Sequence, residues 1–436
     1  MLKRKALDAI SSWKDSPAQT ALLVTGARQT GKTYIIREFG RTHYRHVIEI
    51  NLIESPDLLA VFENTQSARD ILMRLSLATE QPLVSGETLI FIDEVQESPE
   101  IITAIKFLVD EGNYDYILSG SLLGVELNDI RSVPVGYLSV LKMYPLDFEE
   151  FCWASSVSEE MLGTLKECFQ TLKPVDDFIH ARMLDLFNRY LIIGGMPSAV
   201  SVFLATNDIA KTRAVQDDIK RLYRQDISKY TEQDKLTIKE IYDLIPSELN
   251  NPNKRFVLKN LNENARFRSY KNDFSWLIEA DVALAAYNVD EPCQPLLLSK
   301  QRNLFKLFYS DVGLLTSSFL RKASLDVLSG NENINYGSTF ENAVAQELWA
   351  HGFDLYYYNG KKQGEVDFLI EDKDGTVIPL EVKSGKAYTR HSALNNILQV
   401  KNYGLERGYV LGQANVVEQG KIIYLPIYLA AFFANR

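Results

Sequence analysis

The chain of 436 residues is long for a single domain, so roughly two to four domains are expected. Its formal net charge of −10 excludes a uniformly basic nucleic-acid-binding surface and leaves room only for a local patch. No apolar run has the length of a membrane span, no secretory signal follows the basic start, and the three cysteines lack metal-ligand spacing. We therefore expect a cytoplasmic protein with reduced thiols and no membrane contact.

A glycine loop lies between a predicted strand over residues 21–24 and a predicted helix over residues 34–39. It fits the pattern G-x-x-x-x-G-K-[ST] and consists of Gly26, Ala27, Arg28, Gln29, Thr30, Gly31, Lys32 and Thr33. A strand, a glycine loop and a helix in this order direct backbone N–H groups and a helix N-terminus at an anion. The pattern predicts an ATP site in which Lys32 reaches the β- and γ-phosphates and Thr33 binds Mg²⁺. A turn that binds nothing is the alternative, and the flanking elements disfavour it.

A second nucleotide signature follows the apolar run 89–92, which is typical of a strand buried on both faces of a parallel sheet. The strand ends in Asp93, expected to hold Mg²⁺, and Glu94, expected to orient or deprotonate the attacking water. A solvated acidic turn is the alternative. The strand 114–118 ends in Ser119, which is either a γ-phosphate sensor or part of a simple turn. With strands over 47–52 and 138–141, five strands with helical crossovers are predicted.

Several phrases spread over the chain are similar to one known family. They cover residues 26–33, 93–96, 119–121, 144–151, 190–197, 308–315 and 339–342. Together they resemble the bacterial and archaeal AAA-type P-loop ATPases that carry a C-terminal domain of unknown function. Relatives have Gly-Arg before the Pro-Leu-x-Phe phrase, where this chain has Gly136-Tyr137. No arginine finger or sensor is therefore assigned there, and Arg131 is only a weak substitute.

The middle of the chain predicts three helices, over 235–245, 254–261 and 266–280, followed by strands over 283–287 and 304–309. This is the order of a winged helix, and the resemblance to initiator-type ATPases implies the same. Its basic residues make the best candidate for a DNA-contacting surface in this acidic chain. They are Lys254, Arg255, Lys259, Arg266, Arg268 and Lys271. The alternative is a solvated helical face.

Near the C-terminus, two strands of alternating polarity flank the turn 372–376 and predict a β-hairpin. If Asp372 pairs with Thr376, Asp367 lies opposite Glu381, and Lys383 lies on the same face. This set resembles the core of the PD-(D/E)xK nuclease superfamily, which implies that the two acids hold Mg²⁺ and that the lysine assists the water. A helix before the sheet adds an acid, Glu341 or Glu347, with Glu347 retained as the candidate. Opposite charges across a hairpin are also ordinary sheet stabilisation.

The predicted fold class is α/β, with four domains. Residues 1–155 form a P-loop AAA-type ATPase domain with a parallel sheet, and 156–230 a helical lid or linker. Residues 231–325 form a winged-helix-like domain, and 326–436 a restriction-endonuclease-like α/β domain. The predicted function is ATP hydrolysis with Mg²⁺, coupled to binding of DNA, a protein partner or another copy of the chain. The alternatives are an ATP-regulated metal-dependent nuclease and a nucleotide-gated interaction protein with an inert nuclease-like domain.

Overall fold

A computed structural model describes residues 2–63, 67–79, 81–120, 136–227, 235–319, 337–385 and 387–435. The chain forms two compact units, each described here by itself. The first comprises Lys3–Tyr144 together with Glu279–Asp281, and the second comprises Pro145–Ile278 and Val282–Arg436. Arg131, the substitute candidate for an arginine finger, lies outside the described residues.

The first unit is built on a parallel sheet that confirms the five predicted strands. They are β1 (Ala21–Thr25), β2 (His46–Asn51), β3 (Thr88–Asp93), β4 (Asp115–Ser119) and β5 (Leu138–Lys142). Their order in the sheet is β2-β3-β4-β1-β5, and every pairing is parallel. Parallel strands need crossover connections, and in the described residues helices lie between β1 and β2, between β2 and β3, and between β3 and β4.

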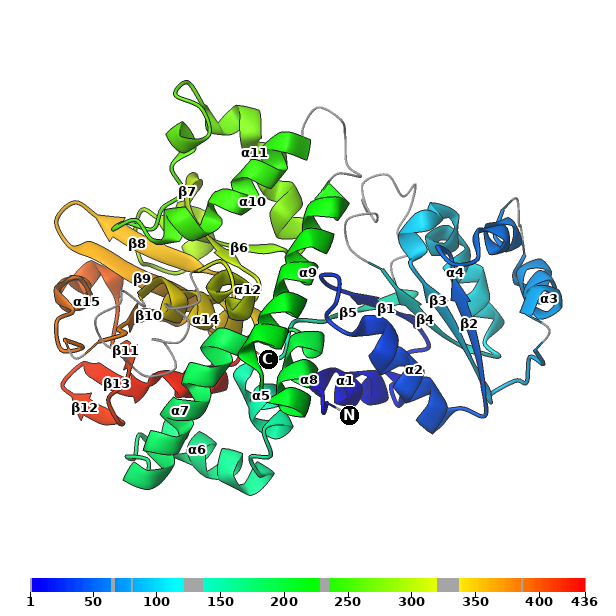
Figure 1. Cartoon of the computed structure of the whole chain (residues 1–436), viewed down its shortest axis with the longest axis horizontal. Helices are drawn as coiled ribbons and strands as arrows, with labels where there is room; N and C mark the ends of the chain where they lie inside the picture. Colours follow the sequence, from blue (N-terminus) through cyan, green and yellow to red (C-terminus); the bar gives the residue numbers. More distant parts are fainter. Residues whose placement is uncertain are drawn as a thin grey trace. The chain divides into compact units, whose positions relative to one another are not determined.

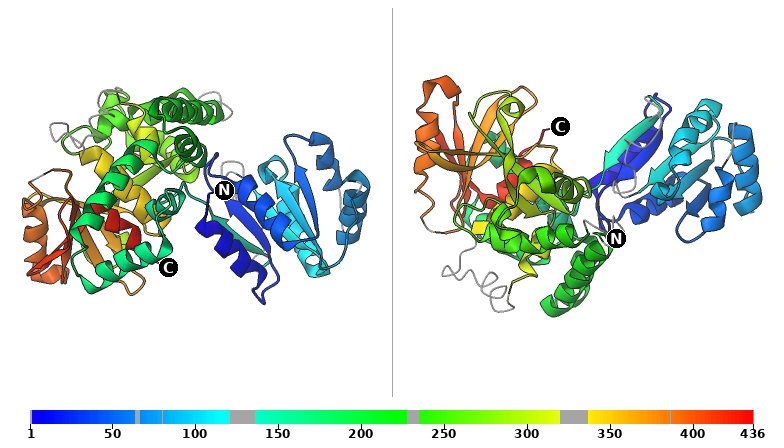
Figure 2. Two further views of the ribbon diagram at one scale, coloured as in Figure 1. Left: turned by 60° about the horizontal axis from the view of Figure 1, so that its bottom comes forward. Right: turned by 90° about the horizontal axis from the view of Figure 1, so that it is seen from above.

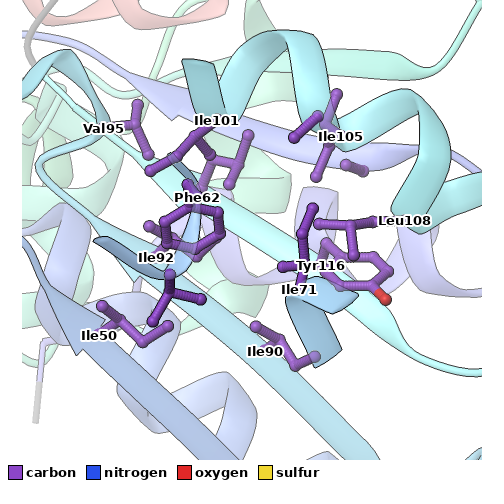
Figure 3. Packing of buried hydrophobic residues seen from close by; sticks show 14 of the residues in the cluster. Ile50, Phe62, Ile71, Ile90, Ile92, Val95, Ile101, Ile105, Leu108 and Tyr116 are labelled. Carbon is purple, nitrogen blue, oxygen red and sulfur yellow. The ribbon is translucent and has the colours of Figure 1, made fainter. Parts of the chain in front are cut away.

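Helices cover both faces of this sheet (Figure 1). They are α1 (Lys5–Lys14), α2 (Lys32–His43), α3 (Ala68–Thr79) and α4 (Pro99–Glu111). Alternate residues of β1 point to opposite faces, so Leu23 packs in the cluster with α3 and α4 while Leu22 packs in the cluster with α1 and α2. Figure 3 shows the first of these clusters, in which Ile90 and Ile92 of β3 lie with Ile101 of α4.

The second unit contains a mixed sheet with eight strands in the order β12-β13-β11-β10-β9-β8-β6-β7. Their bounds are β6 (Ala283–Val289), β7 (Lys300–Tyr309), β8 (Tyr356–Gly360), β9 (Gly364–Glu371), β10 (Val377–Val382), β11 (Gly408–Gly412), β12 (Val417–Gln419) and β13 (Ile422–Pro426). The strands drawn in orange and red, β9 to β13, lie side by side in both views of Figure 2.

The second unit contains the longest helix in the described part of the chain, α9 (Ile209–Ile227). Its other helices are α5 (Phe148–Ala154), α6 (Glu159–Thr171), α7 (Asp177–Ile193), α8 (Pro197–Thr206), α10 (Lys235–Leu249), α11 (Phe267–Glu279), α12 (Val312–Thr316), α14 (Gly337–Ala350) and α15 (Ser392–Leu398). In the described part of the chain, no single helix could span a membrane by length and composition. One bent pair, α7 with α8, passes that test together, at an angle of 119°.

The predicted winged helix is not a separate domain. The second of its three predicted helices is only a short 3-10 turn at Leu258–Asn260. The strands expected to form its wing, β6 and β7, are instead one edge of the eight-stranded sheet, because β6 also pairs in parallel with β8. The predicted boundary at residues 325/326 therefore divides one sheet. The apolar sequence of β6 explains the difference, since a strand that is apolar on both sides needs cover on both faces.

The predicted β-hairpin near the C-terminus has the predicted register. In the antiparallel pair β9–β10, Glu371 lies opposite Val377 and Phe368 opposite Leu380. The next position in the same register sets Asp367 opposite Glu381. The turn closes with the Asp372 N–H donating to the Thr376 carbonyl at 3.1 Å. Local turn chemistry was sufficient to fix this pairing.

Candidate functional site

Three neighbouring strands of the first unit end at the same edge of the sheet. β3, β4 and β1 are adjacent and parallel, so their carboxyl ends lie together. Asp93 ends β3, Ser119 ends β4, and Gly26 follows β1. Ligands of open α/β sheets bind at this edge. The structure thus brings the two predicted nucleotide signatures to one place.

The glycine loop has a backbone that only glycine accommodates at its first position. Gly26 has φ +134°, and a Cβ atom there would lie 2.1 Å from the Met143 carbonyl oxygen. At the other end, Gly31 has φ +94° and is the N-cap of α2, without a side-chain hydrogen bond. The first N–H groups of a helix have no partner within the helix. The loop therefore ends in donors that suit an anion.

Lys32 begins helix α2 and folds back over the loop. Its Nζ donates to the carbonyl oxygens of Gly26 and Ala27, at 2.9 Å each. Burial lowers the pKa of Lys32 to about 8, although Glu94 and Asp93 act in the opposite direction. A cation held in a poorly hydrated loop gains from a phosphate, which is the role predicted for Lys32.

Asp93 connects the loop helix to the two neighbouring strand ends. Its Oδ2 accepts from the Thr33 hydroxyl at 2.9 Å. Its Oδ1 accepts from the Ser119 hydroxyl and, at 3.0 Å, from the Glu94 N–H. Thr33 and Asp93 therefore place two oxygen atoms side by side, and oxygen is the ligand that Mg²⁺ prefers. Thr33 and Asp93 therefore fit the Mg²⁺ that the sequence predicts. Ser119 holds the Asp93 carboxylate in place through its hydrogen bond.

Glu94 has an unusual backbone for its residue type. Its φ of 60° and ψ of 46° lie in the left-handed region. Residues held in this region cluster at functional sites, where surrounding contacts maintain the strain. The Gln96 amide donates to the Glu94 carboxylate and fixes its direction. The absence of a side chain at Gly120 leaves room for this amide, because a Cβ atom there would lie 2.7 Å from Gln96 Oε1.

A cluster of charged side chains lies within the second unit, around Lys306 of β7. This lysine is 0% exposed. Its Nζ lies 2.7 Å from Glu365 Oε1, 3.6 Å from Glu341 Oε2 and 3.8 Å from Asp367 Oδ1. Burial lowers the pKa of Lys306, but the three carboxylates outweigh this effect and raise it. The buried ammonium is therefore charged.

The predicted nuclease-like residues Asp367, Glu381 and Lys383 meet at this cluster. Lys383 Nζ lies 2.6 Å from Glu381 Oε1, and Asp367 Oδ2 accepts from the Val382 N–H at 2.8 Å. Burial and the Asp367 carboxylate raise the pKa of Glu381. Over the described residues, no three acidic, histidine or cysteine side chains are placed so that they could hold a metal ion. The nuclease resemblance assigns the metal to two of these acids, Asp367 and Glu381, and a metal at this site stays a prediction.

Glu347, the helix acid predicted for that site, lies elsewhere. Its Oε1 accepts from the Phe148 N–H at 2.8 Å and from the Tyr190 hydroxyl at 3.0 Å. The other candidate, Glu341, reaches the charge cluster and pairs there with Lys254. The two acids are six positions apart on one helix, and this separation places them on different sides. Only Glu341 therefore reaches the charge cluster. The helix acid predicted from the sequence, Glu347, is corrected to Glu341.

The predicted basic patch loses one member to this cluster. The ammonium of Lys254 is bonded to Glu341, so it cannot serve a phosphate at the same time. The remaining residues differ in exposure, with Arg255 half-buried. Four are exposed and are named here the 259–271 basic group: Lys259, Arg266, Arg268 and Lys271.

Sequence reasoning missed Lys306. A lysine within the apolar run 304–309 is the signal that could have indicated it, because a charge in a buried strand needs a partner.

Comparison with known families assigns part of the chain. Residues 18–152 match a family described as "AAA domain". Residues 184–325 and 336–429 match two families described as domains of unknown function, DUF8612 and DUF4143. No curated protein matches the chain. The first unit thus contains an AAA-type P-loop ATPase domain, as predicted, while the nuclease-like assignment of the C-terminal region stays a prediction.

Solved structures give more distant similarities. The Walker-type ATPase PABY2304 of Pyrococcus abyssi is 13% identical, with 73% of this chain and 95% of that chain covered and a TM-score of 0.43. The Aeropyrum pernix ORC1 protein in complex with DNA is 12% identical, with 75% and 90% covered and a TM-score of 0.29. A Pif1 helicase from Bacteroides is 17% identical, with 44% and 50% covered and a TM-score of 0.24.

Proposed function

We propose that the first unit binds ATP with Mg²⁺ and hydrolyses it at the edge formed by β1, β3 and β4. The observation that carries this proposal is the hydrogen bond of 2.9 Å between Thr33 and Asp93, which joins the start of α2 to the end of β3. A glycine turn without this partner would bind an anion only. With Asp93 beside Thr33 and Glu94 next in sequence, the same edge has groups for a metal and for water.

Each residue then has a defined task. Lys32 and the loop N–H groups bind the β- and γ-phosphates, and Thr33 and Asp93 would hold Mg²⁺, which neutralises phosphate charge when bound. Glu94 orients the attacking water and accepts its proton. The hydrogen bond from Gln96 and the left-handed backbone keep its carboxylate in one direction.

Steady-state ATP hydrolysis tests these roles. Glu94→Gln keeps the size of the side chain but removes the base, so kcat should fall roughly a hundredfold or more while MgATP binding persists. Lys32→Ala should lose MgATP binding in addition to turnover. The matched control is Glu49→Gln, which removes a carboxylate of the same unit that pairs with Arg37 at 2.6 Å. Equal turnover in wild type and Glu94→Gln would exclude Glu94 from the mechanism.

We further propose that nucleotide state is coupled to binding of DNA through the 259–271 basic group. The exposure of these four cations in an acidic chain supports this. Replacing all four by alanine should weaken DNA binding and reduce the slope of log K against log salt by roughly three to four, if each cation contacts one phosphate. An unchanged slope would favour the solvated-face alternative, with a protein partner or a second copy of the chain as the coupled ligand.

For the C-terminal region, the charge pairing favours a structural role over the nuclease alternative. Lys306, Lys254 and Lys383 each contact an acid of the cluster, so three ammonium groups within the protein offset most of the charge of its four carboxylates. We propose that this cluster holds the sheet to α14 and does not cleave nucleic acid. Single- and double-stranded DNA incubated with Mg²⁺ or Mn²⁺ should remain intact. Cleavage that disappears in Asp367→Ala would refute this.

A further inference from the structure

A buried arginine outside both nucleotide signatures contacts the glycine loop. Arg4 precedes helix α1 and is 7% exposed. Its Nη1 donates to the Thr30 carbonyl oxygen at 2.9 Å, and its Nη2 donates to the Tyr144 carbonyl oxygen at 2.7 Å. Ile10 of α1 is packed in the core cluster that contains Ile35 and Phe39 of α2. The arginine is therefore anchored to the layer of the unit that carries the loop.

The contact with Thr30 fixes the orientation of the next N–H group. A trans peptide is planar, and its C=O and N–H bonds point in opposite directions. The peptide between Thr30 and Gly31 is not among the cis bonds of the described chain. Because its C=O points at the buried Arg4, the Gly31 N–H points in the opposite direction, away from Arg4. The guanidinium charge also polarises this peptide and makes its N–H a stronger donor to phosphate.

The contact with Tyr144 joins the loop to the end of the main segment of the first unit. Met143 N–H donates to the Thr25 carbonyl at 2.8 Å, and the Met143 carbonyl lies directly against Gly26. Residues 143–144 thus contact the start of the glycine loop. Arg4 connects the same segment to Thr30, near the end of the loop, through its two hydrogen bonds. Tyr144 ends the main segment of the first unit, and the chain continues into the second unit at Pro145.

We propose that Arg4 is a positioning residue of the nucleotide site, and that it links the state of the glycine loop to the segment where the chain leaves the first unit. This inference rests on the ATP binding proposed above. A phosphate that draws the Gly31 N–H outward also moves the Thr30 carbonyl, since both belong to one rigid peptide. Arg4 then transfers this displacement to Tyr144.

Two variants separate the contribution of the charge from that of the planar fork. Arg4→Lys keeps the charge, but a single ammonium cannot take the place of two donor groups that point to two separate carbonyls. Arg4→Met removes both charge and donors. We expect the Kd for MgATP to rise roughly tenfold in Arg4→Lys and roughly a hundredfold in Arg4→Met. The control is Arg45→Lys, since Arg45 is an exposed residue of the same unit that pairs with Glu87 at 3.4 Å, and its Kd should not change.

Hydrogen exchange provides a readout that a merely stabilising residue would not affect. In wild type, saturating MgATP should slow amide exchange both in residues 26–33 and in residues 143–147. In Arg4→Lys at saturating MgATP, the loop should still be protected, while the nucleotide-dependent protection of 143–147 is lost. If Arg4→Met does not fold, Arg4→Lys alone decides the question.

The possible failures are distinguishable. A folded Arg4→Lys protein with the wild-type Kd and the wild-type exchange pattern would overturn the role of Arg4 and leave the proposed ATPase intact. Wild-type protein that shows no MgATP binding would refute the proposed function, and this inference with it.

Discussion

Replacing Gly26 by alanine should damage the nucleotide site more than any ordinary glycine substitution in the first unit. A residue other than glycine at φ +134° carries a backbone strain of about 1–3 kcal/mol. The new Cβ would also lie 2.1 Å from the Met143 carbonyl oxygen, where ordinary contact begins at 3.4 Å. That oxygen belongs to the backbone next to β5, so it cannot rotate away, and the overpacking adds about 1–3 kcal/mol.

Gly112 provides the matched control for this substitution. It follows α4 with φ +76°, and the nearest atom to an added Cβ is a flexible glutamine oxygen at 3.8 Å. Gly112→Ala therefore carries left-handed strain of about 1–2 kcal/mol without a clash. Denaturant-dependent hydrogen exchange in β1 measures both losses, and MgATP titration measures binding in the folded variants. Equal stability losses together with a wild-type Kd in Gly26→Ala would refute the reasoning.

Three further predictions concern buried groups. Lys306→Met leaves buried carboxylates without their cation and should lower the free energy of unfolding, measured by urea denaturation, by about 3–5 kcal/mol. An unchanged value would show that Lys306 does not stabilise the cluster. Because the pKa of Lys32 is lowered to about 8 and phosphate favours its charged form, the Kd for MgATP should be flat below that pH and rise above it. A Kd that stays constant up to pH 9.5, or a rise that persists in Lys32→Arg, would contradict this. Glu347→Ala should lower the free energy of unfolding by about 2–4 kcal/mol, since it leaves the Phe148 N–H and the Tyr190 hydroxyl without their acceptor. Glu347→Gln keeps an acceptor oxygen and should lower it much less. Equal losses in the two variants would show that the acceptor is not the cause.

The features that the sequence predicted well depend on neighbours along the chain. The glycine loop, Thr33 and Asp93 follow from a strand, a turn and a helix in fixed order. The register that sets Asp367 opposite Glu381 follows from one turn, because the alternation of a strand propagates from it. Local patterns of this kind carry their own geometry.

The features that the sequence did not predict depend on distant partners. Lys306 and Glu341 meet only because β7 and α14 pack together in the second unit. The order of helices and strands suggested a winged helix, but pairing of β6 with β8 lies beyond a local pattern. The contact of Lys254 with Glu341 likewise removed a cation from the predicted DNA surface. A charge pattern alone does not show which charges are already paired.

The most direct test of the account is an equilibrium titration of the nucleotide-free protein with labelled ATP in the presence of Mg²⁺. The geometry at Gly26, Lys32 and Thr33 predicts saturable binding of one ATP per chain, and loss of that binding in Lys32→Ala. Folded wild-type protein that takes up no ATP, or Lys32→Ala protein that binds it as tightly as wild type, would contradict it.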